Sequence, residues 1–373
     1  MPPDNLRPGL YVHVPFCSGK CRYCDFFSAA APGLVRPWLK GLKREVGFYR
    51  GFGPFDTLYF GGGTPSCLAE SDLSYLFDII FSSFEFLPEA EITIEVNPED
   101  VGPAQAGFIM NLGVNRISLG FQSPDPARLE FLGRRHSADQ AFRAVDHFRQ
   151  AGCLNLGLDL IFGLPGQGVD EWRAVLDQVL PLAPEHLSCY QLTIEDRTYF
   201  GRLAKEGLLT PPDEETSRAL FLASSEYLEE RGYVQYEVSN FARGNDFRSR
   251  HNRKYWLGAP YLGLGPSAHS FRDGTRWWNV RSIRKYVDNL ATGRPPVEER
   301  EILTLEQKKL EAILLGLRNS EGVALTDLST SPRAVRELTR ALGQGLVSLR
   351  AGRVIPSRTG LVTADRLAEL LSD

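Results

Sequence analysis

Strand-like and helix-like segments alternate through the first two hundred residues, and this alternation restricts the fold more than any other feature of the sequence. Six short runs have the composition of strands: Leu10–Val14, Thr57–Phe60, Glu91–Val96, Arg116–Leu119, Leu156–Ile161 and Leu187–Leu192. Between them, apolar residues recur at three- and four-residue spacing, which predicts helices at Pro37–Tyr49, Ser71–Phe84, Ala138–Ala151 and Gly168–Leu180. Strand–helix units in succession favour a parallel α/β sheet with right-handed crossovers.

Polar and glycine-rich clusters follow several of these predicted strands. Gly61-Gly62-Gly63-Thr64-Pro65 follows the second, Asn97-Pro98 the third, and Gly163-Leu164-Pro165-Gly166 the fifth. A parallel barrel carries its active-site loops at the carboxyl ends of its strands. The pattern therefore favours a partial (β/α)6 barrel, with an open doubly wound sheet as the alternative.

The pattern changes from about residue 213. A long helix is expected at Glu214–Arg231, followed by the strand-like run Tyr233–Phe241 and a basic, aromatic stretch, and Gly293-Arg294-Pro295-Pro296 marks a second change. Beyond it we expect helices at Leu305–Arg318, Pro332–Leu342 and Ala364–Leu371, with a hairpin between residues 345 and 355. We therefore predict a barrel over residues 1–212, an extension over 213–296, and a C-terminal α+β winged-helix-like domain over 297–373.

Composition excludes some classes of protein. The chain has 42 Lys and Arg against 46 Asp and Glu, a net charge of −4, which argues against coating nucleic acid through bulk charge. No run reaches the ~18 consecutive apolar residues of a transmembrane helix, and residues 1–10 lack the apolar core of a signal peptide. We expect a cytoplasmic protein and leave peripheral membrane association open.

Three of the six cysteines, Cys17, Cys21 and Cys24, form a C-x3-C-x2-C motif directly after the first predicted strand. In a large chain without a secretion signal, such a group indicates metal binding or redox chemistry. Three thiolates can hold three irons of a [4Fe–4S] cluster and leave the fourth iron open. A zinc site completed by a remote residue is the alternative, because structural zinc takes four ligands. The other three, Cys67, Cys153 and Cys189, are expected to be buried apolar groups.

The cysteine motif and Tyr59-Phe60-Gly61-Gly62-Gly63-Thr64-Pro65-Ser66 together resemble the radical S-adenosylmethionine (SAM) superfamily. The resemblance implies a [4Fe–4S] cluster whose open iron binds SAM, and it assigns no separate catalytic side chain. The residues that it implies for SAM contact lie near successive strand ends: Tyr11, Tyr23, Gly62, Gly63, Thr64, Glu95, Gln122, Arg134 and Asp159. Glycines let a backbone approach a ligand closely, and a carboxylate suits a ribose.

Within the superfamily, the sequence resembles the coproporphyrinogen III oxidase-like subfamily, and in it the HemW-type heme chaperones more than the oxygen-independent dehydrogenase. The dehydrogenase has a further cysteine where this chain has Phe26, and a longer segment than the sixteen residues that precede Cys17 here. Residues 251–256 match the H-N-x-x-Y-W motif of HemW-type proteins. This match implies a heme-binding loop that contains His251, Asn252, Tyr255 and Trp256.

The chemistry of this stretch suits a porphyrin. Imidazole is a common axial ligand of heme iron, and aromatic side chains offer flat apolar faces. Five basic residues could pair with the propionates: Arg243, Arg248, Arg250, Arg253 and Lys254. A solvated basic loop is the alternative. Among the other histidines, we expect His136 near the SAM site, His269 near the barrel mouth, and His147 and His186 at the surface.

The sequence thus predicts a heme chaperone on a radical SAM scaffold, which delivers heme to acceptor hemoproteins, respiratory ones by the resemblance. Nucleic acid is not an expected partner, and a homodimer is left open. One alternative is a radical SAM enzyme that converts coproporphyrinogen III to protoporphyrinogen IX, so whether the chain is an enzyme is left open. Another is a non-catalytic iron–sulfur or zinc module whose C-terminal domain binds a nucleic acid or a protein.

Overall fold

A computed structural model describes residues 6–372 of the chain. Its first half forms a curved parallel sheet of β1 (Gly9–Val14), β2 (Phe55–Gly62), β3 (Phe86–Val96), β4 (Arg116–Gln122), β5 (Leu156–Phe162) and β6 (His186–Gln191). These strands are neighbours in chain order, whereas a doubly wound sheet reverses its order at a switch point. The prediction of a partial barrel is therefore confirmed, and the open-sheet alternative is wrong.

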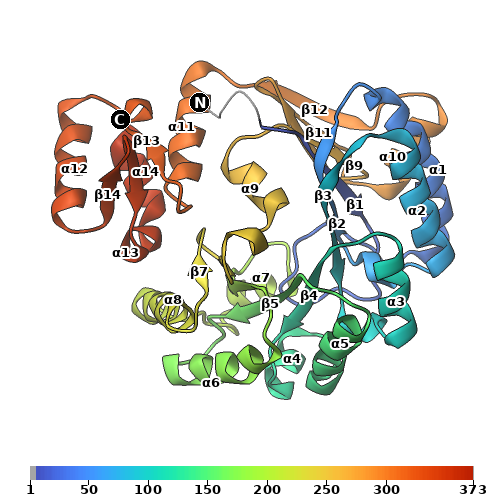
Figure 1. Ribbon diagram of the computed structural model, residues 1–373, viewed down its shortest axis with the longest axis horizontal. Coiled ribbons are helices and arrows are strands. Elements are labelled where there is room, and N and C mark those ends of the chain that lie inside the picture. Colours follow the sequence, from blue (N-terminus) through green and yellow to red (C-terminus); the bar gives the residue numbers. More distant parts are fainter. Residues whose placement is uncertain (1–5, 373) are drawn as a thin grey trace.

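The helices that connect these strands cover the outside of the barrel (Figure 1). They are α1 (Val35–Glu45), α2 (Glu70–Ser83), α3 (Pro103–Asn111), α4 (Pro126–Leu132), α5 (Ala138–Gln150) and α6 (Val169–Val179). Helix α5 shows why they form: Ser137 and Gln140 make a capping box, and one face buries Ala141, Val145 and Phe148. The four helices predicted in this region are present, although the chain tightens into a 3-10 turn at residues 46–49.

Alternation along the strands decides which side chains face the interior of the barrel. On β1, Leu10, Val12 and Val14 are fully buried in the main hydrophobic core, and Tyr11 and His13 line the internal cavity. Successive residues of a strand point to opposite faces, so the polar residues of the barrel strands share the inner face.

The sheet continues beyond the barrel at both edges. Strand β9 (Tyr261–Leu264) pairs parallel to β1, and β10 (His269–Arg272), β11 (Thr275–Asn279) and β12 (Val297–Ile302) follow it in antiparallel order. At the other edge, β8 (Asn240–Ala242) pairs with β6, and β7 (Val234–Gln235) lies outermost. Within residues 6–372 the sheet has 12 strands, and the sequence patterns did not predict β9 to β12.

The H-N-x-x-Y-W stretch is a helix, α9 (Arg250–Trp256), so the prediction of a loop is wrong. The Ser249 side chain accepts a hydrogen bond from the backbone N–H of Asn252. The buried carboxylate of Glu91, on β3, accepts the backbone N–H groups of Arg250 at 3.0 Å and His251 at 2.9 Å. This distant carboxylate satisfies two of the free N–H groups of the first helical turn and so stabilises the helix.

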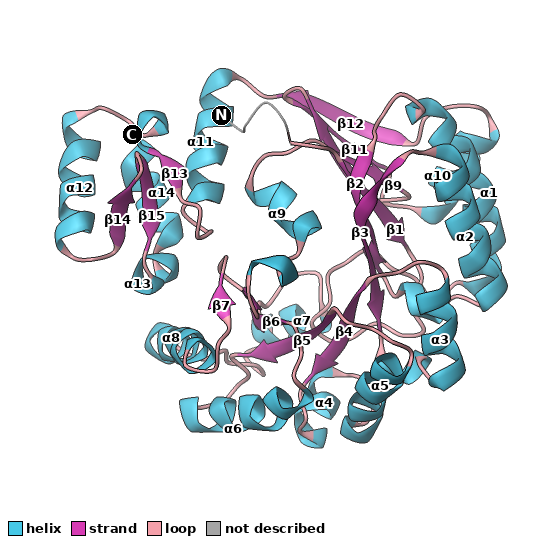
Figure 2. Cartoon of the chain, in the orientation of Figure 1, coloured by secondary structure: helices cyan, strands magenta, loops and turns pink. Residues whose placement is uncertain are grey.

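The remaining helices include α7 (Tyr199–Lys205), α8 (Glu214–Glu229) and α10 (Ile283–Ala291). The C-terminal lobe contains α11 (Leu305–Gly316), α12 (Pro332–Gly343), α13 (Arg358–Val362) and α14 (Ala364–Ser372), with a small sheet of β13 (Val323–Ala324), β15 (Arg353–Pro356) and β14 (Val347–Arg350). The lobe encloses its own hydrophobic cluster, which includes Ile313, Val354 and Leu367, and it lies beside the barrel (Figure 2). The sequence predicts α11, α12, α14 and the hairpin of β14 and β15, whereas it did not predict α13 or β13. No helix along residues 6–372 has both the length and the apolar composition needed to cross a membrane.

Candidate functional site

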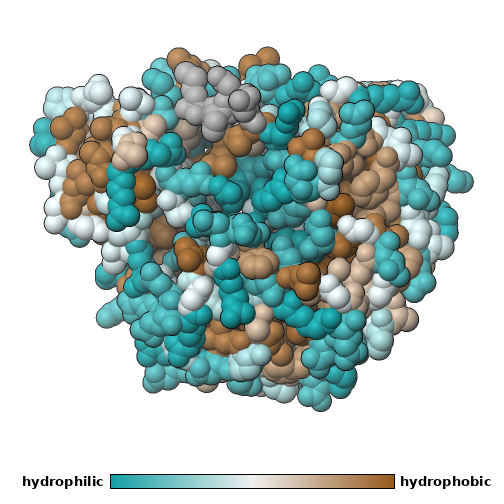
Figure 3. Space-filling model, in the orientation of Figure 1, coloured by the Kyte–Doolittle hydropathy of each residue, from teal (hydrophilic) through white to brown (hydrophobic). Residues whose placement is uncertain are grey.

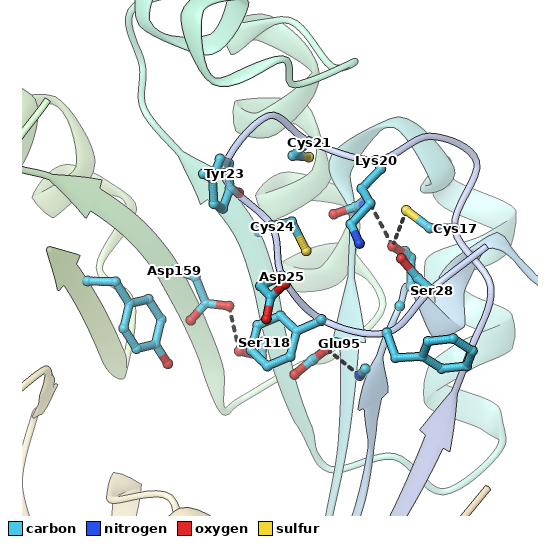
Figure 4. Close-up of a pocket in the computed structure, with 18 of the residues that line it drawn as sticks. Cys17, Lys20, Cys21, Tyr23, Cys24, Asp25, Ser28, Glu95, Ser118 and Asp159 are labelled. Carbon is cyan, nitrogen blue, oxygen red and sulfur yellow. Dashed lines mark hydrogen bonds between the residues drawn. The ribbon is translucent and has the colours of Figure 1, made fainter. Parts of the chain in front are cut away.

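A cavity of about 830 Å³ lies inside the barrel, at the carboxyl ends of its strands. The loop that follows β1 crosses one side of it, and the inner faces of β2 to β6 form the wall (Figure 4). The three motif cysteines line this cavity, and so do the nine residues that the resemblance implies for SAM contact. Sequence positions spread over about 150 residues thus meet in one place.

The cysteine loop holds its thiols free and partly exposed. The Cys17 Sγ lies 3.3 Å from Thr64 Oγ1 and donates to the Gly19 carbonyl at 2.9 Å. The guanidinium of Arg134 donates from Nη1 to Cys21 Sγ at 3.6 Å. Burial raises the pKa of the Cys24 thiol, so a cationic partner is needed to favour its thiolate form.

The donor set of this loop suits a cluster better than a single ion. In the described part of the chain, no group of three or more Cys, His, Asp or Glu side chains is placed to hold one metal ion. Zinc would draw its sulfur ligands to ~2.3 Å from one point. An iron–sulfur cube instead gives each cysteine its own iron, so the thiols must surround a wider space. Figure 4 shows the three sulfur atoms around such a space.

The glycines after β2 allow the chain to approach the backbone that leads into the cysteine loop. Gly63 N–H donates to the Val14 carbonyl at 2.8 Å, and Thr64 N–H donates to the Phe16 carbonyl at 2.7 Å. A Cβ atom at Gly63 would lie 2.3 Å from the Phe16 carbonyl oxygen. At Gly62, where φ is +108°, a Cβ would meet the His13 ring at 2.4 Å. Larger residues would therefore displace the loop that carries Cys17.

Two half-buried residues, Glu95 on β3 and Asp159 on β5, present their carboxyl groups to the cavity. Glu95 accepts the Tyr59 hydroxyl at 2.9 Å and the Gly62 N–H at 3.1 Å, yet burial raises its pKa to about 7. Asp159 accepts the Ser118 hydroxyl on Oδ2 at 2.8 Å, and burial raises its pKa as well. Its Oδ1 atom is buried without a hydrogen-bond partner among the described residues. Such an atom is a natural acceptor for a hydroxyl or ammonium group of a ligand.

Arg134 connects the carboxyl ends of β3 and β4 to the cysteine loop. Its Nη2 donates to Asn97 Oδ1 at 2.7 Å and to the Gly120 carbonyl at 3.0 Å. Asn97 in turn donates to Thr64 Oγ1 at 3.0 Å. Gln122, at the end of β4, has a φ of +63°, a strained conformation for a residue other than glycine that is typical of functional sites.

The structure does not bring the four predicted heme-binding residues to one surface. Within the described chain, Tyr255 is the one member of this set that lines the cavity. His251 is buried behind it, with its ring hydrogen-bonded to Thr57 Oγ1 and to the Tyr255 hydroxyl, each at 2.9 Å. Burial and the nearby Lys254 lower the His251 pKa to about 3, so its imidazole is neutral. Asn252 and Trp256, on the same helix, are half-buried outside the cavity lining.

The basic residues around this helix are also engaged elsewhere. Lys254 Nζ lies 2.6 Å from Asp56 and donates to the Arg7 carbonyl at 2.7 Å, and Arg253 pairs with Glu321. The lining contains none of the five predicted propionate partners, as far as the described residues go: Arg243, Arg248, Arg250, Arg253 and Lys254. These residues therefore lie outside the cavity lining, and their pairing with propionates stays a prediction.

The prediction of a surface position for His186 is wrong. Its side chain is buried on β6, and its Nε2 lies 2.8 Å from the Tyr236 hydroxyl. It belongs to a polar layer beneath the cavity that also contains the fully buried Arg116. Cys153 and Cys189 are buried as predicted, whereas Cys67 is only half-buried.

Sequence reasoning missed several lining residues: His13, Tyr59, Asn97, Ser118 and Arg281. Period-two alternation was a usable signal for some of them, because His13 is two residues after Tyr11 and Ser118 is four residues before Gln122. Arg281 had no such signal. It reaches the cavity through the antiparallel strands that extend the sheet beyond β1, and it donates to the Asp25 carbonyl at 2.8 Å.

Comparisons with known proteins agree with this site. The family model of the radical SAM superfamily matches residues 11–179. The chain is 34% identical over 370 residues to a protein of Mycobacterium tuberculosis named heme chaperone HemW, with 97% of this chain and 94% of that protein covered. It is 35% identical over 321 residues to the Bacillus subtilis protein of the same name, with 84% of each covered. Among solved structures, coproporphyrinogen III oxidase (HemN) of Escherichia coli matches with a TM-score of 0.84 at 22% identity, covering 98% of this chain and 90% of that chain, which shows a shared fold.

Proposed function

Because the chain belongs to the HemW family within the radical SAM superfamily, we propose that it is a heme chaperone that binds a [4Fe–4S] cluster and SAM in the barrel cavity and passes heme to acceptor hemoproteins. The observation that carries the cofactor part is the convergence of the cysteines and the nine SAM-contact candidates on one cavity. A cytoplasmic location and respiratory acceptors are part of the proposal and rest on the family resemblance.

Each set of residues has a role that its chemistry supports. Cys17, Cys21 and Cys24 hold three irons of the cluster, which when bound supplies a redox-active centre with an open iron site for SAM. The backbone beside Gly62 and Gly63 lies close enough to the cavity to receive the ammonium group of SAM. The paired acceptor atoms of Glu95 suit two ribose hydroxyls.

Arg134 and Asp159 complete the binding surface for the polar parts of SAM. Arg134 is a fixed cation beside Cys21 and offsets negative charge on a cluster. The unpartnered Oδ1 of Asp159 accepts from a hydroxyl or amino group of the nucleoside. Tyr23, on the cysteine loop, presents an apolar ring to the adenine.

Anaerobic reconstitution with iron and sulfide tests the cofactor proposal. We expect the wild-type chain to incorporate about four irons per chain and to bind SAM, as the composition of the cluster requires. Cys24→Ala should lose the cluster absorbance, whereas Cys189→Ala, at a buried cysteine away from the loop, should keep it. Zinc without iron or sulfide in anaerobically purified protein would contradict the proposal.

Two further assays separate chaperone from enzyme. The proposal requires the wild-type chain to bind heme and to transfer it to an apo-hemoprotein. It also requires that the reconstituted protein, with SAM and a reductant, leave coproporphyrinogen III unchanged. Anaerobic formation of protoporphyrinogen IX without heme transfer would support the dehydrogenase alternative instead.

A further inference from the structure

The cavity has a wall that the cofactor proposal does not use. It lies on the far side of β1 from β3 and β5, where β9, β10 and β11 extend the sheet. Ser267, His269 and Arg281 line the cavity there, together with the aromatic rings of Phe27, Tyr255 and Tyr261. A cationic and aromatic wall that faces open space is suited to a flat, apolar, anionic ligand.

The histidines differ sharply in whether they can reach a ligand. His251 has both ring nitrogens hydrogen-bonded, to Thr57 and Tyr255. His13 lines the cavity but is held in the same way, by the Tyr11 hydroxyl at 3.1 Å and the Phe27 carbonyl at 2.7 Å. His136 and His186 are buried, form hydrogen bonds and lie outside the cavity lining. His147 lies half-buried on α5 and is hydrogen-bonded to the Val101 carbonyl.

His269 is the exception. Its side chain is exposed and lines the cavity, and no hydrogen bond engages its ring in the described part of the chain. The ring stacks on Trp278, its cross-strand partner on β11, with 5.7 Å between ring centroids and 25° between ring planes. Partial burial and the positive charge of Arg276 lower its pKa. Its imidazole is therefore neutral at physiological pH and keeps a free lone pair, the form that coordinates metals.

Two cationic side chains, Arg281 and Lys20, line the same cavity as this histidine. Arg281 donates to the Asp25 carbonyl and lies 3.8 Å from the Asp25 carboxylate, with 40% of its side chain exposed. Lys20, on the cysteine loop, also lines the cavity, and Figure 4 shows its amino group beside the open space between the thiols. Both side chains retain donors for carboxylates of a ligand.

We propose that His269 is the residue of this chain that coordinates the heme iron, with Arg281 as a partner for a propionate and the Tyr255 and Tyr261 rings beside the macrocycle. This inference rests on the proposed heme binding and assigns its place. Coordination transfers the lone pair of a neutral imidazole to iron, so no proton is released and no electron is exchanged. His251, in this arrangement, is a positioning residue that holds the Tyr255 hydroxyl from behind.

Heme titration with absorption and magnetic circular dichroism spectra tests this assignment. The wild-type chain, His269→Ala, His251→Gln and the control His147→Ala are compared at equal protein concentration and pH. We expect His269→Ala to weaken binding at least tenfold and to lose the spectrum of histidine-ligated heme. Added imidazole should restore that spectrum in this variant, because it refills the vacated position. His251→Gln and His147→Ala should keep the histidine-ligated spectrum.

The outcomes separate the two proposals. A wild-type chain that binds no heme overturns the proposed function, and this inference with it. A wild-type chain that binds heme, with an unchanged His269→Ala spectrum, overturns only the assignment of His269. The assignment also fails if imidazole restores the spectrum in His251→Gln but not in His269→Ala. If His269→Ala loses the histidine-ligated spectrum and imidazole fails to restore it, that result likewise counts against the assignment. A thioether-ligated spectrum in His269→Met would confirm that the side chain at this position coordinates the iron.

Discussion

A single buried carboxyl group, Glu45 at the end of α1, ties three elements of the barrel edge together. It accepts the Gly265 N–H at 2.8 Å, the Asn279 amide at 2.5 Å and the Tyr286 hydroxyl at 2.5 Å. Burial nevertheless raises its pKa from 4.5 to about 7. Because Gly265 lies in the turn before His269, this carboxyl group helps to fix the wall proposed for heme.

The pKa of Glu45 predicts how stability depends on pH. Between its unfolded value of 4.5 and its folded value of about 7, the folded state holds more protons than the unfolded state. The Glu45 contribution to stability therefore falls as pH rises through this window. Glu45→Gln removes this dependence, so the variant should gain up to about 3 kcal/mol relative to the wild type between pH 4.5 and pH 8. Urea unfolding at these two pH values measures the difference in the free energy of unfolding between the variant and the wild type. If that difference stays constant or falls as pH rises, the raised pKa of Glu45 is refuted.

Gly63 provides a steric prediction at the same scale. In Gly63→Ala the new Cβ would press on the Phe16 carbonyl, so the chain must move at the entry to the cysteine loop. Overpacking of this kind costs about 1–3 kcal/mol, and the displaced Cys17 should reduce iron incorporation. The control is Gly107→Ala on α3, where a Cβ meets nothing within 4 Å and should stabilise the helix slightly. Denaturation of both variants checks the predicted loss of stability, and iron analysis checks the predicted loss of the cluster. An iron content in Gly63→Ala equal to that in Gly107→Ala would contradict the displacement of Cys17.

Among the elements, α9 depends most on a distant partner. Its seven residues begin at a Ser249 cap, but the Glu91 carboxylate from β3 satisfies two further N–H groups. The negative charge of Glu91 also favours the fully buried guanidinium of Arg116. Helix α9 is therefore held in place by the charge layer beneath the cavity.

Glu91→Ala should release α9 because it removes both acceptors and leaves the Arg116 charge without its main partner. Leaving a buried N–H donor without its acceptor costs about 1–3 kcal/mol. Hydrogen exchange should become faster over residues 250–256. The increase should be smaller in Glu91→Gln, because that variant keeps one acceptor oxygen. Unchanged exchange over α9 in Glu91→Ala would show that the helix stands without this carboxylate.

At the scale of the whole molecule, two hydrophobic cores meet across polar contacts. The C-terminal lobe pairs with the rest of the chain through backbone hydrogen bonds of Val238 and Ser320 and through Arg358, which contacts Glu226 and Glu229 on α8. Hydrophobic residues gather over this lobe on the face shown in Figure 3, while hydrophilic residues cover much of the barrel. Since the contacts between the lobe and the barrel are polar, we expect the lobe to loosen without disruption of the barrel core.

Arg358→Glu tests this independence. The new charge would face two glutamates that are themselves largely exposed, so the cost to global stability should be less than about 1 kcal/mol. Hydrogen exchange should nonetheless become faster in α13 and α14 and remain unchanged in β1 to β6. Uniform acceleration across the chain would show instead that the two cores open as one unit.

The sequence alone determined the features that depend on local order along the chain. Alternating strand and helix patterns predicted β1 to β6 and their order in the sheet, since each strand pairs with the next after a crossover helix. The cysteine spacing and the glycine motif carried the resemblance to the radical SAM superfamily, and that resemblance implied Glu95, Gln122 and Asp159 as site residues. Their convergence on one cavity agrees with a parallel barrel, in which the strand ends meet on one face.

The tertiary structure decided what depends on contacts between distant residues. Strand β9 pairs with β1 from about 250 residues away, and nothing in the local pattern of residues 261–264 signals a partner at that distance. The H-N-x-x-Y-W residues are helical because a glutamate on β3 caps them, and His251 is closed off because Thr57 and Tyr255 occupy its nitrogens. Tertiary contacts decide which histidine nitrogens already have hydrogen-bond partners, and therefore which histidine can still bind a ligand. Residue type and spacing along the chain do not contain this information.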